Sequence, residues 1–198
     1  MPLNASGAIS LAGSTAGQSI SNEFRSITTS QTSLSEYYRG GSYVGPHNGP
    51  VAASGAISFS QFYSASKRNA KTITISANTY NYNLQTSSVS GYSAGWTDVT
   101  LTINSGVTVY ATGGSSALQV ASGFASGDTI FINNSGLIIG SGGGGASAGG
   151  TGGGGNHAIN LQPSSYSNVR ITNNSGGIIA GGGGGGGGGM AALAYAAD

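Results

Sequence analysis

Acidic side chains are the first candidates for chemistry, because a glycoside hydrolase needs two carboxyl groups about 5 to 9.5 Å apart. Beyond residue 71 the chain has only Asp98, Asp128 and Asp198. Asp98 and Asp128 would lie on neighbouring coils if the chain formed a solenoid. Turn or strand-edge positions explain them more simply, so we predict no catalytic residue and a protein that is not an enzyme.

Metal and phosphate sites also lack their usual residues. His47 and His157 have few carboxylates near them in sequence, and the chain has no cysteine, so we expect no metal ion. The glycine-rich stretch "SGGGGASAGGTGGGGN" does not end in the Lys-Ser or Lys-Thr pair of a phosphate-binding loop. The sequence therefore predicts no cofactor.

Charged residues are scarce and unevenly placed. The 198 residues include six Lys and Arg and five Asp and Glu, too few for a nucleic-acid interface. We also expect no membrane insertion, because there is no run of about 18 apolar residues, and no secretory signal is visible at the start. Five of the six cations precede residue 72, which suggests two parts with a boundary near residue 70.

The first part repeats two short patterns, ASGAIS and a run of Ser, apolar, Ser, Glu or Gln, aromatic and Tyr. Each copy is too short to hold its own core, and the chain between copies is rich in Gly, Pro and Ser. We therefore predict that residues 1–70 form an extended docking arm that lies along a larger partner, although incidental surface turns with aromatic plugs are the alternative. The copies are ASGAIS at 5–10 and 53–58, SLSEYY at 33–38 and SFSQFY at 58–63, and the predicted docking anchors are Tyr37, Tyr38, Phe62 and Tyr63.

These segments resemble the N-terminal part of many tailed-phage structural proteins. "MPLNASGAISL", "SLSEYYRGGSYV" and "SGAISFSQFYSASK" follow one another in the order found in that group, over roughly the first 68 residues. Residues 12–31 depart from the pattern, being longer and more polar. The resemblance implies a protein of the virion tail or its fibres, with other tail proteins as partners.

Residues 71–139 predict a region rich in strands. "KTITISANTYNYNL" alternates with a period of two, which is typical of a half-buried strand. Further strands flank Asn-Ser-Gly at 104–106, 134–136 and 174–176, where Asn and Gly favour a left-handed turn. The pattern predicts a mainly β fold of stacked strand-turn-strand units, either antiparallel hairpins or the coils of a solenoid.

Residues 140–198 form the glycine-rich region, with a further strand unit inside it. Glycine dominates 140–155 and fills 181–189, and the other residues of the first run are Ala, Ser and Thr. Small residues suit polyglycine II helices, which have three residues per turn and a rise of about 3.1 Å. We predict a packed sandwich of such helices; a flexible linker is the alternative.

A second resemblance concerns about residues 99–189. "NVRITNNSGGIIAGGGGGGGGG", with "GGNHAINL" before it, is similar to the glycine-rich domain of tail-fibre tip adhesins of T-even-type phages. In that family a strand leads into glycine runs that form a sandwich of polyglycine II helices, and loops between them touch the bacterial receptor. This chain differs in its N-terminal segment and in ending soon after the glycines with "MAALAYAAD".

Aromatic residues among polar neighbours are the candidates for receptor binding. We select Tyr92 and Trp96 in "SGYSAGWTD" and Tyr166 in "QPSSYSN", although a core position is equally compatible with Trp96.

The sequence and its resemblances together predict a bacteriophage virion structural protein, a tail or neck fibre component and host-attachment adhesin. By analogy with long β fibres it would be a homotrimer. Its other expected partner is a host surface glycan or outer-membrane protein, and its location is the virion, assembled in the host cytoplasm. The rival prediction is a β-helical depolymerase acting on host polysaccharide.

Overall fold

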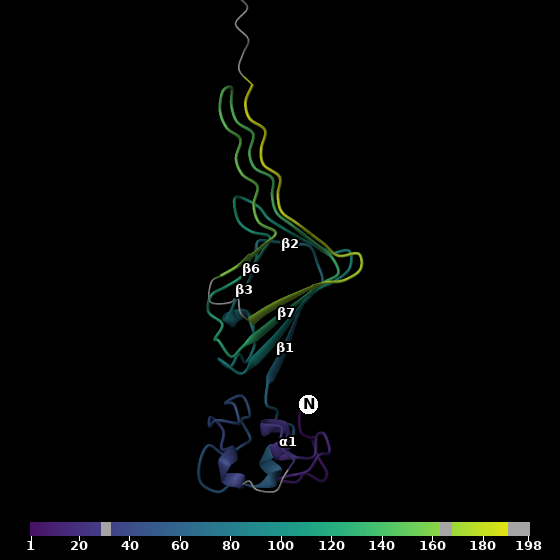
Figure 1. The fold of residues 1–198 in the computed structure, drawn as a ribbon, viewed down its shortest axis with the longest axis vertical. Coiled ribbons are helices and arrows are strands. Elements are labelled where there is room, and N and C mark those ends of the chain that lie inside the picture. The colour runs from purple at the N-terminus through teal and green to yellow at the C-terminus, as the bar shows by residue number, and fades with distance from the viewer. Residues whose placement is uncertain (29–32, 163–167, 190–198) are drawn as a thin grey trace, which may run out of the picture. The chain divides into compact units, whose positions relative to one another are not determined.

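The computed structural model describes residues 1–28, 33–162 and 168–189 (Figure 1). It divides into two compact units. The first comprises residues 1–71 and 90–98, and the second comprises residues 72–89 and 99–198.

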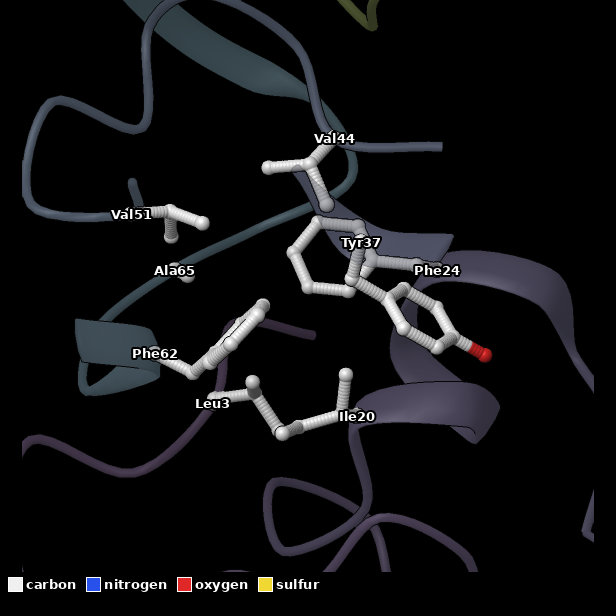
Figure 2. Close-up of a cluster of buried hydrophobic side chains, with 8 residues drawn as sticks. All are labelled: Leu3, Ile20, Phe24, Tyr37, Val44, Val51, Phe62 and Ala65. Carbon is white, nitrogen blue, oxygen red and sulfur yellow. The ribbon is translucent and has the colours of Figure 1, made fainter. Parts of the chain in front are cut away.

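The first unit has a hydrophobic core of its own, built around three short helices (Figure 2). The rings of Phe24, Tyr37 and Phe62 meet there, with centroids 6.2 to 6.5 Å apart. The expected extended arm is therefore wrong: no single copy of the repeat can enclose a core, but rings from distant segments converge to make one. The helices are α1 (Ile20–Arg25), η1 (Leu34–Tyr37) and η2 (Phe59–Phe62), and the core residues are Leu3, Ile20, Phe24, Tyr37, Val44, Val51, Phe62 and Ala65.

From residue 69 onward the regular elements of the described chain are mainly short β-strands. The elements are β1 (Asn69–Ile75), β2 (Thr79–Tyr80), β3 (Tyr82–Leu84), η3 (Thr86–Ser88), β4 (Thr97–Ile103), β5 (Thr108–Tyr110), β6 (Leu118–Val120), β7 (Thr129–Asn134), β8 (Leu137–Ile139), β9 (Ile159–Leu161), β10 (Val169–Asn173) and β11 (Ile178–Ala180).

These strands form three sheets in which each strand lies beside the one three places further along the chain. The sheet orders are β1-β4-β7-β10, β11-β8-β5-β2 and β3-β6-β9. Strand β7 runs parallel to β10, and the pairs of the other two sheets are parallel as well. The chain is thus mainly β, and of the two arrangements left open by the sequence, the structure has the coils of a solenoid and not antiparallel hairpins.

Along β4 and β7 every second side chain points into the interior of the solenoid and fills it. In β4, Val99, Leu101 and Ile103 are fully buried, and the residues between them are partly exposed. Ile130 and Ile132 of β7 repeat this pattern on the next strand of the sheet. Period-two burial is what the alternating β-branched sequence predicts.

The Asn-Ser-Gly triplets occupy corners of the coils but do not all have the same conformation. Residues 104–107 and 174–177 form four-residue corners, in which Gly106 and Gly176 have φ values of 77° and 83°. The left-handed turn expected there is confirmed.

The middle triplet is different, and the same expectation is wrong for it. Asn134 is the last residue of β7, so only Ser135 and Gly136 separate β7 from β8. The buried Asn134 amide donates to the Gly136 carbonyl at 3.1 Å and to the Asn173 side-chain oxygen at 2.8 Å. This side chain supplies the hydrogen bonds that a longer turn would make for itself. A Cβ on Gly136 would collide with the Val107 carbonyl oxygen, so the short corner needs glycine for space.

Three glycine-rich segments of the second unit run side by side, as Figure 1 shows. They are residues 140–148, 150–156 and 181–189, and we call them the glycine bundle. The first donates to the third, as in Gly143 N to Gly183 O at 2.8 Å. The third donates to the second (Gly185 N to Gly153 O, 2.7 Å), and the second donates to the first (Gly153 N to Gly144 O, 2.8 Å). The backbone hydrogen bonds therefore close a ring of three segments.

Only every third glycine of the bundle lies where a side chain has no room. A Cβ at Gly182, Gly185 or Gly188 would strike a backbone carbonyl of the first segment, whereas one at Gly183 or Gly186 would meet nothing within 4 Å. The same spacing holds at 140 and 143, and at 152 and 155. The glycine requirement thus has a period of three.

We predict opposite effects for two neighbouring substitutions. Gly185→Ala should lower the free energy of unfolding by about 1 to 3 kcal/mol, because its methyl group overpacks the bundle against the Gly144 carbonyl. Gly186→Ala, the matched control, should leave stability unchanged or raise it by about 0.4 to 1 kcal/mol, since it only restricts the unfolded chain. Thermal unfolding of both variants checks this. Equal melting temperatures would contradict a packed bundle.

Candidate functional site

The repeated patterns of the first unit form two matching structures. Ser33 is the N-cap residue of η1, and Ser58 is the N-cap residue of η2. Each forms a capping box with the residue three positions further on, Glu36 or Gln61. The Ser33 N–H donates to the Glu36 carboxylate at 2.9 Å, and the Ser58 N–H donates to the Gln61 side-chain oxygen at 3.3 Å. The Ser-x-x-Glu/Gln spacing is therefore a helix start in both copies.

The final tyrosines of the two copies connect the repeats to each other. Tyr38 donates its hydroxyl to the Gly55 carbonyl, and Tyr63 donates to the Gly7 carbonyl, both at 2.6 Å. Gly7 and Gly55 occupy the same place in the two ASGAIS copies, and both have a positive φ. The tyrosine that ends each copy of the Ser-apolar-Ser pattern is thus hydrogen-bonded to one copy of ASGAIS.

This arrangement changes how the predicted docking anchors are interpreted. Tyr37 and Phe62 are fully buried in the core of their own unit, so neither ring faces a partner in this fold. Tyr38 and Tyr63 remain partly exposed, although their hydroxyls have partners within the unit. Phe59 is 43% exposed, and sequence analysis overlooked it because its position in the repeat is merely "apolar".

Two of the three predicted receptor-binding residues lie in the described structure, both in the first unit. Tyr92 and Trp96 belong to the first unit and are partly buried. The Trp96 ring lies 6.4 Å from the His47 ring, and an added Cβ on Gly45 would touch both. Trp96 therefore packs within the unit. Tyr166 lies outside the described residues, and a receptor role for the three remains a prediction.

Both carboxylates considered for catalysis take part in structural contacts. Asp98 forms an ion pair with Arg68 at 2.7 Å, and the same guanidinium donates to the Gly95 and Thr97 carbonyls. Asp128 is fully buried and accepts a hydrogen bond from the Ala125 N–H at 2.8 Å. One carboxylate therefore neutralises a cation, while the other fixes a loop.

The surroundings of His47 disfavour its protonated form. Burial lowers its pKa, and the nearby Arg68 and Lys71 lower it further, against the effect of the Ser66 carbonyl. Its Nε2 atom lies 3.0 Å from that carbonyl oxygen. Among the described residues, no three His, Asp or Glu side chains are grouped closely enough to hold a metal ion.

The outer end of the glycine bundle is a short loop without charge. Ser147, Ala148 and Gly149 are exposed, and the Gly150 N–H donates to the Ser147 carbonyl at 2.9 Å to close the turn. Gly149 has a φ of 78°. In the parts of the chain that the structure covers, no helix is long and apolar enough to cross a membrane.

A comparison with known protein families identifies the family of the chain. The family described as phage tail fibre adhesin Gp38 matches residues 70–197. The chain belongs to the phage tail fibre adhesin Gp38 family. The predicted resemblance to tail-fibre adhesins is thereby confirmed, and the match covers the solenoid and the glycine bundle. No curated protein and no solved structure shows significant similarity to the chain.

We predict that the two carboxylates matter for stability and not for adsorption. Asp128→Asn keeps an oxygen that can accept from the Ala125 N–H and should have little effect, whereas Asp128→Ala removes this acceptor and should cost about 1 to 3 kcal/mol. Asp98→Asn should likewise leave adsorption near wild type. Adsorption of assembled particles and thermal unfolding are the measurements. Reducing sugar released from host polysaccharide by the wild type but not by the Asn variants would instead identify an enzyme.

Proposed function

We propose that this tail fibre adhesin joins the virion through its first unit and contacts the host surface through the loop that ends its glycine bundle. The observation that carries the proposal is the closed ring of backbone hydrogen bonds, which makes a stiff support from segments that would otherwise be flexible. A stiff support holds a short loop in position at little entropic cost on binding.

We further propose that the three segments are polyglycine II helices. Hydrogen bonds repeat every third residue, as in Gly182, Gly185 and Gly188, and none of residues 181–189 has a positive φ. Both features match a helix with three residues per turn and a φ near −75°. Collagen likewise requires glycine at each third position, where chains approach most closely.

The remaining partners follow from this role. The first unit would bind another virion tail protein, and the loop would bind a host glycan or outer-membrane protein. A homotrimer assembled in the host cytoplasm is the oligomeric state that we propose by analogy with other β fibres. The protein would act without catalysis.

A polysaccharide depolymerase remains the second candidate, because the solenoid is the scaffold on which we expected such an enzyme. Against it stand the structural contacts of Asp98 and Asp128. An assay for sugar release from host capsule or lipopolysaccharide separates the two functions.

The first prediction from this proposal concerns the loop. Ala148→Glu adds bulk and charge at an exposed position and should reduce adsorption of assembled particles at least about tenfold, the effect of losing about 1.4 kcal/mol. Ser115→Glu makes the same chemical change at another exposed turn and should adsorb normally. Normal adsorption by particles that carry Ala148→Glu would rule out the loop as the contact.

The second concerns the first unit. Phe59→Ser removes the exposed ring and should lower the amount of this protein in purified virions, whereas Phe59→Leu should be incorporated nearly as well. Quantitative immunoblotting of particles measures this. Wild-type incorporation of Phe59→Ser, with the core intact by circular dichroism, would show that docking uses another surface.

A further inference from the structure

The strongest feature outside the proposed contacts is a single cation on the solenoid. Arg170 is the only Lys or Arg after residue 71. It lies on β10 opposite Phe131 of β7, and its guanidinium carbon is 5.9 Å from the centre of the Phe131 ring. The residues on either side of Phe131, Ile130 and Ile132, are buried, so Arg170 and Phe131 face outward.

Arg170 has no partner that accounts for its charge. Within the described residues its guanidinium makes no ion pair and no hydrogen bond to another group, whereas Arg25 and Arg68 each pair with a carboxylate. Stacking on an aromatic ring uses the face of the guanidinium plane and leaves its N–H edge directed elsewhere. That edge matches a carboxylate or phosphate with two parallel hydrogen bonds.

A shallow hollow of about 250 Å³ surrounds this cation. Phe131 supplies apolar surface beside the charge, and Thr129, Asn168 and Val169 complete the lining. The Asn168 side chain is fixed by donating to the Ala125 and Ser126 carbonyls at 3.2 and 3.0 Å. The hollow is smaller than the roughly 300 to 1,000 Å³ of most ligand pockets, so it suits one small group on a longer molecule.

We propose that this hollow binds an acidic sugar unit, in which a carboxylate or phosphate pairs with Arg170 and the C–H face of the sugar lies on Phe131. The apolar surface next to the charge favours an acidic sugar over a bare inorganic anion. Its biological setting rests on the proposed host-attachment function: a side contact with an acidic surface glycan would add to the contact made by the loop of the bundle.

Titration of the purified full chain with galacturonic acid and glucose 6-phosphate, followed by NMR at low salt, tests the site. Both acidic sugars should bind weakly, with dissociation constants on the order of millimolar, and at least about tenfold more tightly than galactose and glucose. Inorganic phosphate should bind more weakly than glucose 6-phosphate. Binding should weaken as salt is raised, because the pair is exposed.

Variants assign the binding to these residues. Arg170→Gln should weaken it at least about tenfold, the loss expected for a charge-assisted hydrogen bond, and Phe131→Leu should weaken it severalfold by removing the stacked ring. Thr172→Ala, an exposed change two residues along β10, is the control and should bind as wild type. Equal binding of acidic and neutral sugars, equal binding of inorganic phosphate and glucose 6-phosphate, or unchanged binding by Arg170→Gln would overturn the inference.

The same titration separates this inference from the proposed function. Ala148→Glu lies on the bundle loop and should bind the acidic sugars normally while its particles fail to adsorb. Normal adsorption of that variant would overturn the loop contact alone, whereas loss of sugar binding in it would count against a separate site at Arg170.

Discussion

The second unit depends on backbone hydrogen bonds between segments that are neighbours in space but distant in the sequence. In the solenoid each strand satisfies its amides against the strand three places along the chain, and side chains add the packing. The interior of the glycine bundle has almost no side chains, so the ring of backbone hydrogen bonds holds the three segments together. Any group that separates two segments there breaks these bonds, which explains why glycine stands where a Cβ would strike a neighbouring backbone, as at Gly182, Gly185 and Gly188.

The first unit is stabilised differently. Its segments have little regular structure, and aromatic rings such as Phe24, Tyr37 and Phe62 bring them together. Capping boxes and the two tyrosine hydroxyls fix the loops around that core. The repeated pattern, which the sequence predicts to bind a partner, thus has an internal structural role, and the docking that we propose would use the exposed surface of the unit.

Family membership identifies a protein of the phage tail fibre. The described solenoid places its carboxylates in an ion pair and a loop, while the arginine on its outer face contacts an aromatic ring and no carboxylate among the described residues. A surface with few charges makes each unpaired charge more informative, because solubility here depends mainly on hydroxyl, amide and backbone groups. The features that we propose for recognition are the uncharged loop of the bundle and the Arg170 hollow.

The sequence by itself determined the mainly β fold, the two left-handed corners at Gly106 and Gly176, and the adhesin family, because alternation, turn residues and glycine runs are local signals. Only the tertiary structure decided that the strands stack as parallel coils, since period-two alternation is the same in hairpins and solenoids. It also decided the short corner at Asn134, the burial of Tyr37 and Phe62, and the pairing of Arg170 with Phe131. These depend on contacts between residues 25 to 44 positions apart in the sequence, and the packing of the whole unit decides which residues meet.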